Sequence, residues 1–123
     1  MTQENKELLL NDLCSRLVYG VKCCVKNNHK ISGDLVGIVG ENVYIYSSGH
    51  AIFSISDIKP YLFPLSSMTD EQKQEYQYIT ERWMYDSSYS ISDSIDWLNA
   101  HHFDYRNLIQ MKLAIDATGL NIY

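Results

Sequence analysis

The sequence predicts a single α+β domain with an N-terminal helix, a small and strongly bent antiparallel sheet and three C-terminal helices. Three observations support this prediction: helical periodicity near both ends, short alternating segments between them, and glycines inside one of those segments. A chain of 123 residues, 46% of them hydrophobic, has enough apolar side chains for one core. We expect residues 1–65 to form the helix and the sheet, and residues 66–123 to form a helical part packed on them.

The first expected element is a helix over residues 5–17, which ends before Gly20. Its apolar residues recur at steps of three and four, so they share one stripe of the helix surface. This stripe consists of Leu9, Leu10, Leu13, Cys14 and Leu17.

A four-stranded antiparallel meander is expected next, because turn residues separate segments in which apolar and polar residues alternate. These segments are residues 21–26, 31–39, 43–46 and 51–55. In the last of them, Ala51, Phe53 and Ile55 oppose Ile52 and Ser54.

Gly33 and Gly37 lie inside the second segment, where glycine often marks a bulge or a sharp bend. A helix followed by a bent meander is the order of elements in small SH3-like and Sm-like barrels. We therefore expect a partial barrel, and either Ile58–Phe63 or Asn121–Tyr123 is expected to supply a fifth strand that closes the sheet.

Three helices are expected after Pro64. Thr69 and Gln72 have the spacing of a capping box, which predicts a helix that continues through residue 83. Asp93 is expected to cap the next helix, which includes His102, and Asp104 is expected to cap a short one through Met111.

The net charge of −5 belongs to the C-terminal half of the chain. Residues 64–123 hold nine acidic and four basic residues, whereas residues 20–63 are close to neutral. A broad phosphate-binding surface is not expected in the acidic half, because binding to polyanions requires clustered Lys and Arg. An acidic surface can instead engage a basic protein or mimic nucleic acid, provided that its carboxylates cluster in the fold.

The composition predicts a cytoplasmic protein without membrane contact. The chain has no apolar run long enough to cross a bilayer, and its polar start lacks the features of a signal peptide. Its three cysteines do not form an even-numbered framework, so we expect reduced thiols. Cys14 and Cys23 are expected to face the core, which leaves Cys24 as the candidate for an exposed thiol.

Three stretches resemble a group of small proteins of unknown activity from Bacteroides-type gut bacteria and their phages. The stretches are residues 13–21, residues 58–69, and residues 97–106 with 108–109 and 113–114. In that group, a glycine usually stands at the position of Lys112. The resemblance implies an intracellular protein of a gut bacterium or of its mobile elements, and it implies no activity or site residues.

The densest group of possible metal ligands is His101, His102 and Asp104. Adjacent histidines on a helix point about 100° apart, which is poor spacing for a zinc site. Helix capping explains Asp104, and a hydrogen-bonded, half-buried histidine explains His102. These residues are therefore weak candidates, and we expect neither a metal nor another cofactor.

The candidate binding residues are aromatic. Tyr44 and Tyr46 share one face of their expected strand, where they either form a patch for protein or bases or, as we expect, are covered by the helices. Trp83, Tyr85 and Tyr89 form a second group, explained equally well by an interface and by core packing.

The sequence therefore predicts a noncatalytic accessory or regulatory protein that binds a protein partner, with a second copy of the chain among the candidate partners. No nucleophile elbow, phosphate loop or dinucleotide fingerprint is present. The first alternative is nucleic-acid binding through Lys22, Lys26 and Lys30 with the two tyrosines, and the second is a metal-dependent enzyme that uses the His101, His102 and Asp104 group.

Overall fold

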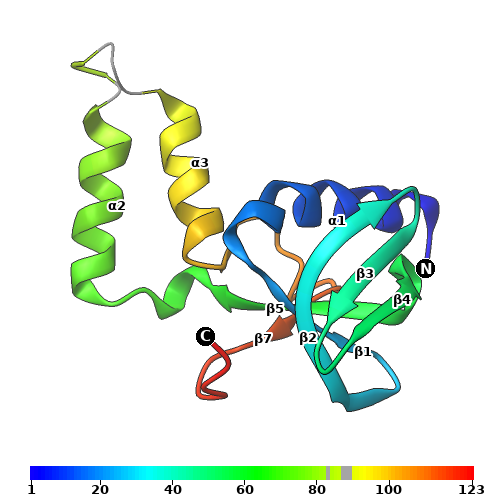
Figure 1. The fold of residues 1–123 in the computed structure, drawn as a ribbon. Helices are drawn as coiled ribbons and strands as arrows, with labels where there is room; N and C mark the ends of the chain where they lie inside the picture. Colours follow the sequence, from blue (N-terminus) through cyan, green and yellow to red (C-terminus); the bar gives the residue numbers. More distant parts are fainter. Residues whose placement is uncertain (83, 87–89) are drawn as a thin grey trace.

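The computed structural model describes residues 1–82, 84–86 and 90–123. Figure 1 shows a body of α1 and a curved sheet, with a hairpin of α2 and α3 at one side. The helices are α1 (Gln3–Arg16), α2 (Asp70–Arg82) and α3 (Ile91–Ala100), and short 3₁₀ turns cover Leu17–Tyr19, Ile55–Asp57 and Leu65–Ser67. The strands are β1 (Lys22–Val25), β2 (Asn28–Val39), β3 (Asn42–Tyr46), β4 (His50–Ser54), β5 (Ile58–Pro64), β6 (Phe103–Asp104) and β7 (Ile115–Asp116).

The sheet is open and mixed, so the expected partial barrel is wrong. Its strands follow the order β4-β3-β2-β1-β5-β6, and β7 also pairs with β5. The meander and the additional strand that begins at Ile58 are confirmed, but this strand does not close the sheet. Residues 58–60 of β5 pair antiparallel with β1, whereas residues 61–64 pair parallel with β6 and β7. β5 therefore extends the sheet away from β4.

The expectation of three C-terminal helices is also wrong, because only α2 and α3 follow the meander among the described residues. The chain after Asp104 forms turns instead of a helix. Asn107 and Lys112 have φ angles of 67° and 62°, which are left-handed and interrupt an α-helix. Lys112 thus adopts a backbone conformation that glycine favours, and a glycine usually stands at this position in the group that the sequence resembles.

The main core lies between α1 and one face of the sheet. Leu9 and Leu13 of α1 are buried against residues of β1, β2, β3 and β5, among them Cys23, Leu35, Val43, Ile45 and Leu62. Helix α1 begins at the Thr2 cap, whose hydroxyl accepts a hydrogen bond from the Asn5 N–H.

The opposite face of β1 is covered as well. Cys24 packs there against Tyr61 and Ala117, so the expected exposure of its thiol is wrong; Cys14 is the exposed cysteine. The cover comes from the chain around β7, whose attachment to β5 was not expected. Cys23 is buried on the core face, as expected, and all three cysteines are free thiols.

The α2–α3 hairpin is joined to the body through α3. Trp97 and Leu98 are buried with Phe103, and Tyr76 and Ile79 of α2 pack against this cluster. α2 itself has no buried residue. Thr69 and Gln72 form the expected capping box, whereas α3 is capped by Ser90 with Asp93 as its capping-box partner. Among the described helices, none has the length and apolar character needed to cross a membrane.

Candidate functional site

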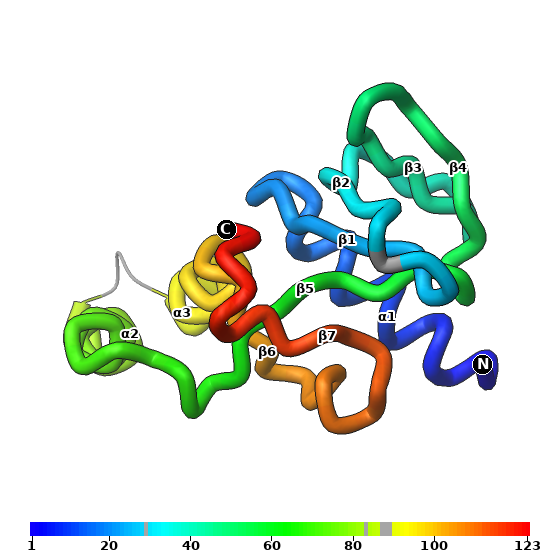
Figure 2. The backbone as a smooth tube through the Cα atoms, turned by 90° about the horizontal axis from the view of Figure 1, so that it is seen from below, coloured from blue at the N-terminus to red at the C-terminus, as the bar shows by residue number. Residues whose placement is uncertain are grey.

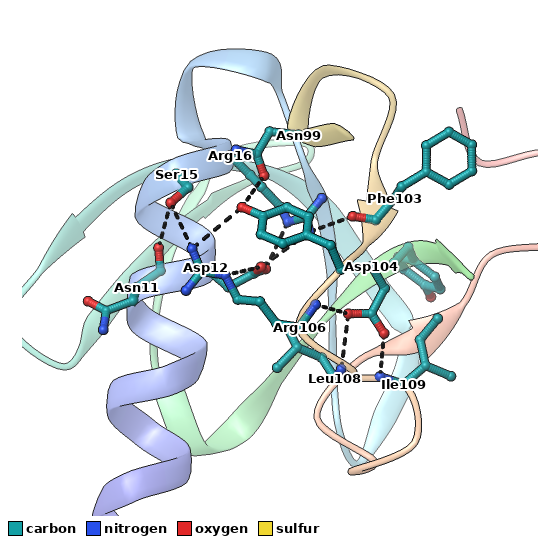
Figure 3. A network of polar contacts seen from close by, with 12 residues as sticks. Asn11, Asp12, Ser15, Arg16, Asn99, Phe103, Asp104, Arg106, Leu108 and Ile109 are labelled. Carbon is teal, nitrogen blue, oxygen red and sulfur yellow. Dashed lines mark hydrogen bonds and ion pairs between the residues drawn. The ribbon is translucent and has the colours of Figure 1, made fainter. Parts of the chain in front are cut away.

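A buried polar network ties α1 to the chain around β6 (Figure 3). Asp12 and Arg16 lie one turn apart on α1, and neither side chain is exposed to solvent. Arg16 Nε lies 2.8 Å from Asp12 Oδ2, and its Nη2 donates at 3.2 Å to Oδ1 and at 2.7 Å to the Phe103 carbonyl. Because the last bond spans 87 residues of sequence, it fixes the helix to a distant strand.

Arg106 reaches the same carboxylate from the loop after β6. Its Nε lies 3.3 Å from Asp12 Oδ1 as an ion pair. The guanidinium carbons of both arginines lie 5.2 Å from the centroid of the Tyr105 ring, and the Tyr105 hydroxyl donates to Asn99 Oδ1 at 2.9 Å. α1, α3 and the β6 loop therefore meet in one network.

We interpret this network as structural. Burial raises the pKa of the Asp12 carboxyl, and the charges of Arg16 and Arg106 oppose this effect. The carboxylate is enclosed by its partners, and the network contains neither a thiol nor an imidazole that could act as a nucleophile or base. Its chemistry suits the stable joining of three elements more than a reaction.

The structure places His101, His102 and Asp104 in separate environments. The His101 ring stacks on Trp97 with 4.1 Å between centroids, and its Nδ1 lies 2.9 Å from the Trp97 carbonyl oxygen. Asp104 accepts hydrogen bonds from the N–H groups of Leu108 and Ile109, which organises the turn in place of the expected helix. Within the described part of the chain, no three His, Cys, Asp or Glu side chains converge as metal ligands.

His102 lies after α3 and not on its apolar stripe, because the helix ends at Ala100. Its φ angle is 64°, and its ring stacks on Tyr123 at 3.6 Å. Burial lowers the pKa of His102 to about 4, and the charges of Arg16, His101 and Lys22 add to this effect. The folded protein therefore keeps this imidazole neutral.

This pKa predicts acid sensitivity. A histidine in the unfolded chain has a pKa near 6.5, so between pH 6.5 and pH 4 the unfolded state binds a proton that the folded state does not. The folded state therefore has its full stability, as far as His102 is concerned, above pH 6.5 and loses stability as the pH falls toward 4. Since His102 is half-buried, we expect the free energy of unfolding to fall between pH 7 and pH 5 by about 1–2 kcal/mol more in the wild type than in His102→Asn. Asparagine tolerates the left-handed backbone. Equal pH dependence in urea denaturation of the two proteins would contradict this assignment.

The outer face of β3 and β4 carries a group that we call the aromatic patch: half-buried Tyr44 and exposed Tyr46, His50 and Ile52. Tyr44 is opposite Ile52 and Tyr46 is opposite His50 in the antiparallel register. The rings of Tyr46 and His50 lie 5.0 Å apart. Tyr46 is 45% and Ile52 60% exposed, so the expectation that helices cover this face is wrong.

The patch is uncovered because the helices pack elsewhere. α1 occupies the other face of these strands, and the α2–α3 hairpin lies at the β5 and β6 end of the molecule (Figure 2). Gly37 is opposite Tyr44, whose ring atoms are its nearest neighbours, and a register shift between Leu35 and Gly37 bends β2 there. The bend predicted from the glycines is confirmed.

β4 forms one edge of the sheet. In the part of the chain that the structure describes, its backbone pairs with β3 on one side and with nothing on the other. Ile52 and this edge were missed by the sequence prediction. The signal was present, because Ile52 is an apolar residue on the otherwise polar side of the alternation in residues 51–55.

The other candidates lie apart from the patch. Tyr85 is strongly exposed at the end of α2, and Trp83 and Tyr89 fall outside the described residues. Lys22 Nζ lies 2.7 Å from Asp34, a residue opposite Tyr46, so this side of the patch carries a neutralised pair instead of a basic surface. The nucleic-acid alternative stays a prediction with less support.

The net charge is concentrated on the hairpin. Residues 70–96, which we call the acidic hairpin, contain seven acidic and two basic residues, a balance of −5. This equals the net charge of the chain, so the remaining residues are neutral in sum. Seven of the nine acidic residues in the C-terminal half therefore belong to the hairpin, and an acidic surface formed by them stays a prediction.

Comparison with protein-family models, curated proteins and solved structures finds no match to this chain.

Proposed function

We propose that this chain is a noncatalytic, cytoplasmic protein-binding protein of accessory or regulatory function, and that its partner adds a strand to the open edge of β4 beside the aromatic patch. The observation that carries the proposal is the uncovered outer face, on which exposed Ile52 lies opposite half-buried Tyr44 and exposed Tyr46 lies opposite His50. Tyrosine supplies large contact area with a polar tip, and aromatic residues are enriched in protein interfaces.

The edge strand itself supports this proposal. Natural proteins protect sheet edges with Lys, Pro, bulges or covering elements. β4 has the sequence His-Ala-Ile-Phe-Ser, which contains no charged residue and no proline, and it pairs with β3 in unbroken register from His50 to Ser54. An edge of this kind favours strand addition, in which main-chain hydrogen bonds give affinity and side chains give specificity.

A second copy of the chain is the partner that fits best. Two antiparallel β4 strands related by a two-fold axis at Ile52 place apolar side chains next to each other and bring no like charges together. The acidic hairpin lies at the opposite end of the molecule from β4 (Figure 2), so the net charges of two copies stay far apart in this arrangement. Binding at the hairpin end would place them close together.

Sedimentation velocity of the wild type and of Ile52→Lys tests this proposal. We expect a dimer for the wild type and a monomer for the variant, because a lysine on the edge brings two positive charges together across the two-fold axis. Val18→Lys is the matched control, since Val18 is an exposed apolar residue outside the sheet. A wild-type monomer at all concentrations, or equal effects of both lysines, would contradict the proposal.

A further inference from the structure

The acidic hairpin has an apolar stripe that the body of the protein covers at one end only. Ile91, Ile95 and Leu98 follow each other at steps of four and three residues, so they share one face of α3. Leu98 is 3% exposed, Ile95 38% and Ile91 64%. Exposure therefore rises along a single stripe toward the tip of the hairpin, where the body no longer covers it (Figure 1).

Further apolar side chains are exposed on the same hairpin. Met84 and Tyr85 lie just after α2 and are both strongly exposed, and Tyr78 is exposed on α2. Together with Ile91 and Ile95, these are five large apolar side chains on a hairpin whose first helix has no buried residue. Ile91 and Ile95 lie one turn apart on α3 and form a contiguous pair, and contiguous exposed apolar side chains are typical of interaction sites.

The charge of the hairpin determines which partner fits. The balance of −5 is carried by α2, by α3 and by Asp86 between them, and packed helices lie about 10 Å apart, which is close to one Debye length at physiological salt. A partner that covers Ile91 and Ile95 must therefore approach through a negative field. A segment with apolar residues on one side and Lys or Arg on the other matches both the stripe and the field.

We propose that the α3 stripe of the acidic hairpin binds a basic amphipathic helix of another protein. This proposal is independent of strand addition at β4, because the two surfaces lie at opposite ends of the molecule (Figure 2). The partner helix lies along Ile95 and Ile91, and its basic side chains face the carboxylates of the hairpin.

The test uses a synthetic leucine–lysine peptide with leucines at helical spacing, titrated into the isotope-labelled full chain and followed by NMR. We expect shifts centred on the Ile91 and Ile95 methyl groups and binding that weakens with added salt. A leucine–lysine peptide of equal composition with strand-like spacing, and a leucine–glutamate peptide with helical spacing, are expected to bind at least about tenfold more weakly.

Two pairs of variants separate the stripe from general charge attraction. Ile91→Ser/Ile95→Ser is expected to weaken peptide binding by about tenfold or more, while Val18→Ser/Val39→Ser, which changes exposed apolar residues of the body, leaves it unchanged. Glu75→Gln/Glu81→Gln is expected to weaken binding more than Glu4→Gln/Glu7→Gln on α1. All these side chains lie outside the core, so the variants are expected to fold. Unchanged binding by the hairpin variants, or equal losses in the controls, would overturn the proposal.

Discussion

Replacing Asp12 with alanine is expected to lower the free energy of unfolding by about 3–5 kcal/mol, the largest single-residue effect that we predict. Asp12 is the acidic partner of Arg16, and both side chains are enclosed. Removing the carboxylate leaves the Arg16 guanidinium in the interior without its ion-pair partner, and it also leaves Arg106 without this partner. Urea denaturation at neutral pH measures the difference.

Two further variants make this prediction specific. Glu7→Ala removes an exposed carboxylate from the same helix and is expected to change stability by less than about 0.5 kcal/mol. Asp12→Leu combined with Arg16→Met removes both buried charges and is expected to cost less than Asp12→Ala alone, because no uncompensated charge stays inside. If Asp12→Ala costs no more than Glu7→Ala, the network does not hold α1 to β6.

The second large effect is expected for Gly33→Ala, at about 2–3 kcal/mol of destabilisation. A Cβ at Gly33 would overlap the backbone carbonyl of Tyr46 and would also lie 3.1 Å from Ile45 Cγ2. Backbone cannot give way as a flexible side chain does, so β2 and β3 must separate locally. Thermal or urea unfolding of the variant and of the wild type measures this loss of stability.

Gly37→Ala is the matched control for Gly33→Ala. It lies four residues along the same strand, and its added Cβ would meet Tyr44 atoms at 3.8 Å, an ordinary contact. We expect a change of less than about 1 kcal/mol, since alanine in a strand also loses less conformational entropy than glycine. Similar costs at both positions would show that close approach of β3 is not the reason for glycine at residue 33.

Local pattern predicted most of the elements of this fold. The Leu9 and Leu13 spacing predicted α1, the Thr69 and Gln72 pair predicted the start of α2, and the alternation in residues 21–55 predicted the meander. The sequence signal failed where long-range pairing decides the structure. β6 and β7 are two residues each, too short for any periodicity, and they exist because β5 offers them an edge.

The stripe of α1 shows why the buried network was missed. Leu9, Asp12, Leu13 and Arg16 have the spacing of one helix face, and this is the face that is buried, whereas Cys14 is exposed. Charged residues are almost never enclosed unless they are paired. Their partners, the Phe103 carbonyl and Arg106, are 87 or more residues away, and one sequence does not show them.

The members of the aromatic patch were predicted in part. Tyr44 and Tyr46 were placed correctly on one face, but whether a helix covers that face depends on where α2 and α3 pack, which their own amphipathic patterns do not specify. Ile52 was the missed member of the patch. The charge of the hairpin was visible in the sequence, and the fold adds that Ile91 and Ile95 extend beyond the body.

Amide hydrogen exchange measured at low and high protein concentration tests most directly whether a second copy of the chain adds its strand to β4. We predict that exchange of the β4 amides, residues 50–54, slows as the concentration rises, while exchange in α2 does not change. β4 amides that exchange at the same rate at every concentration would contradict the account.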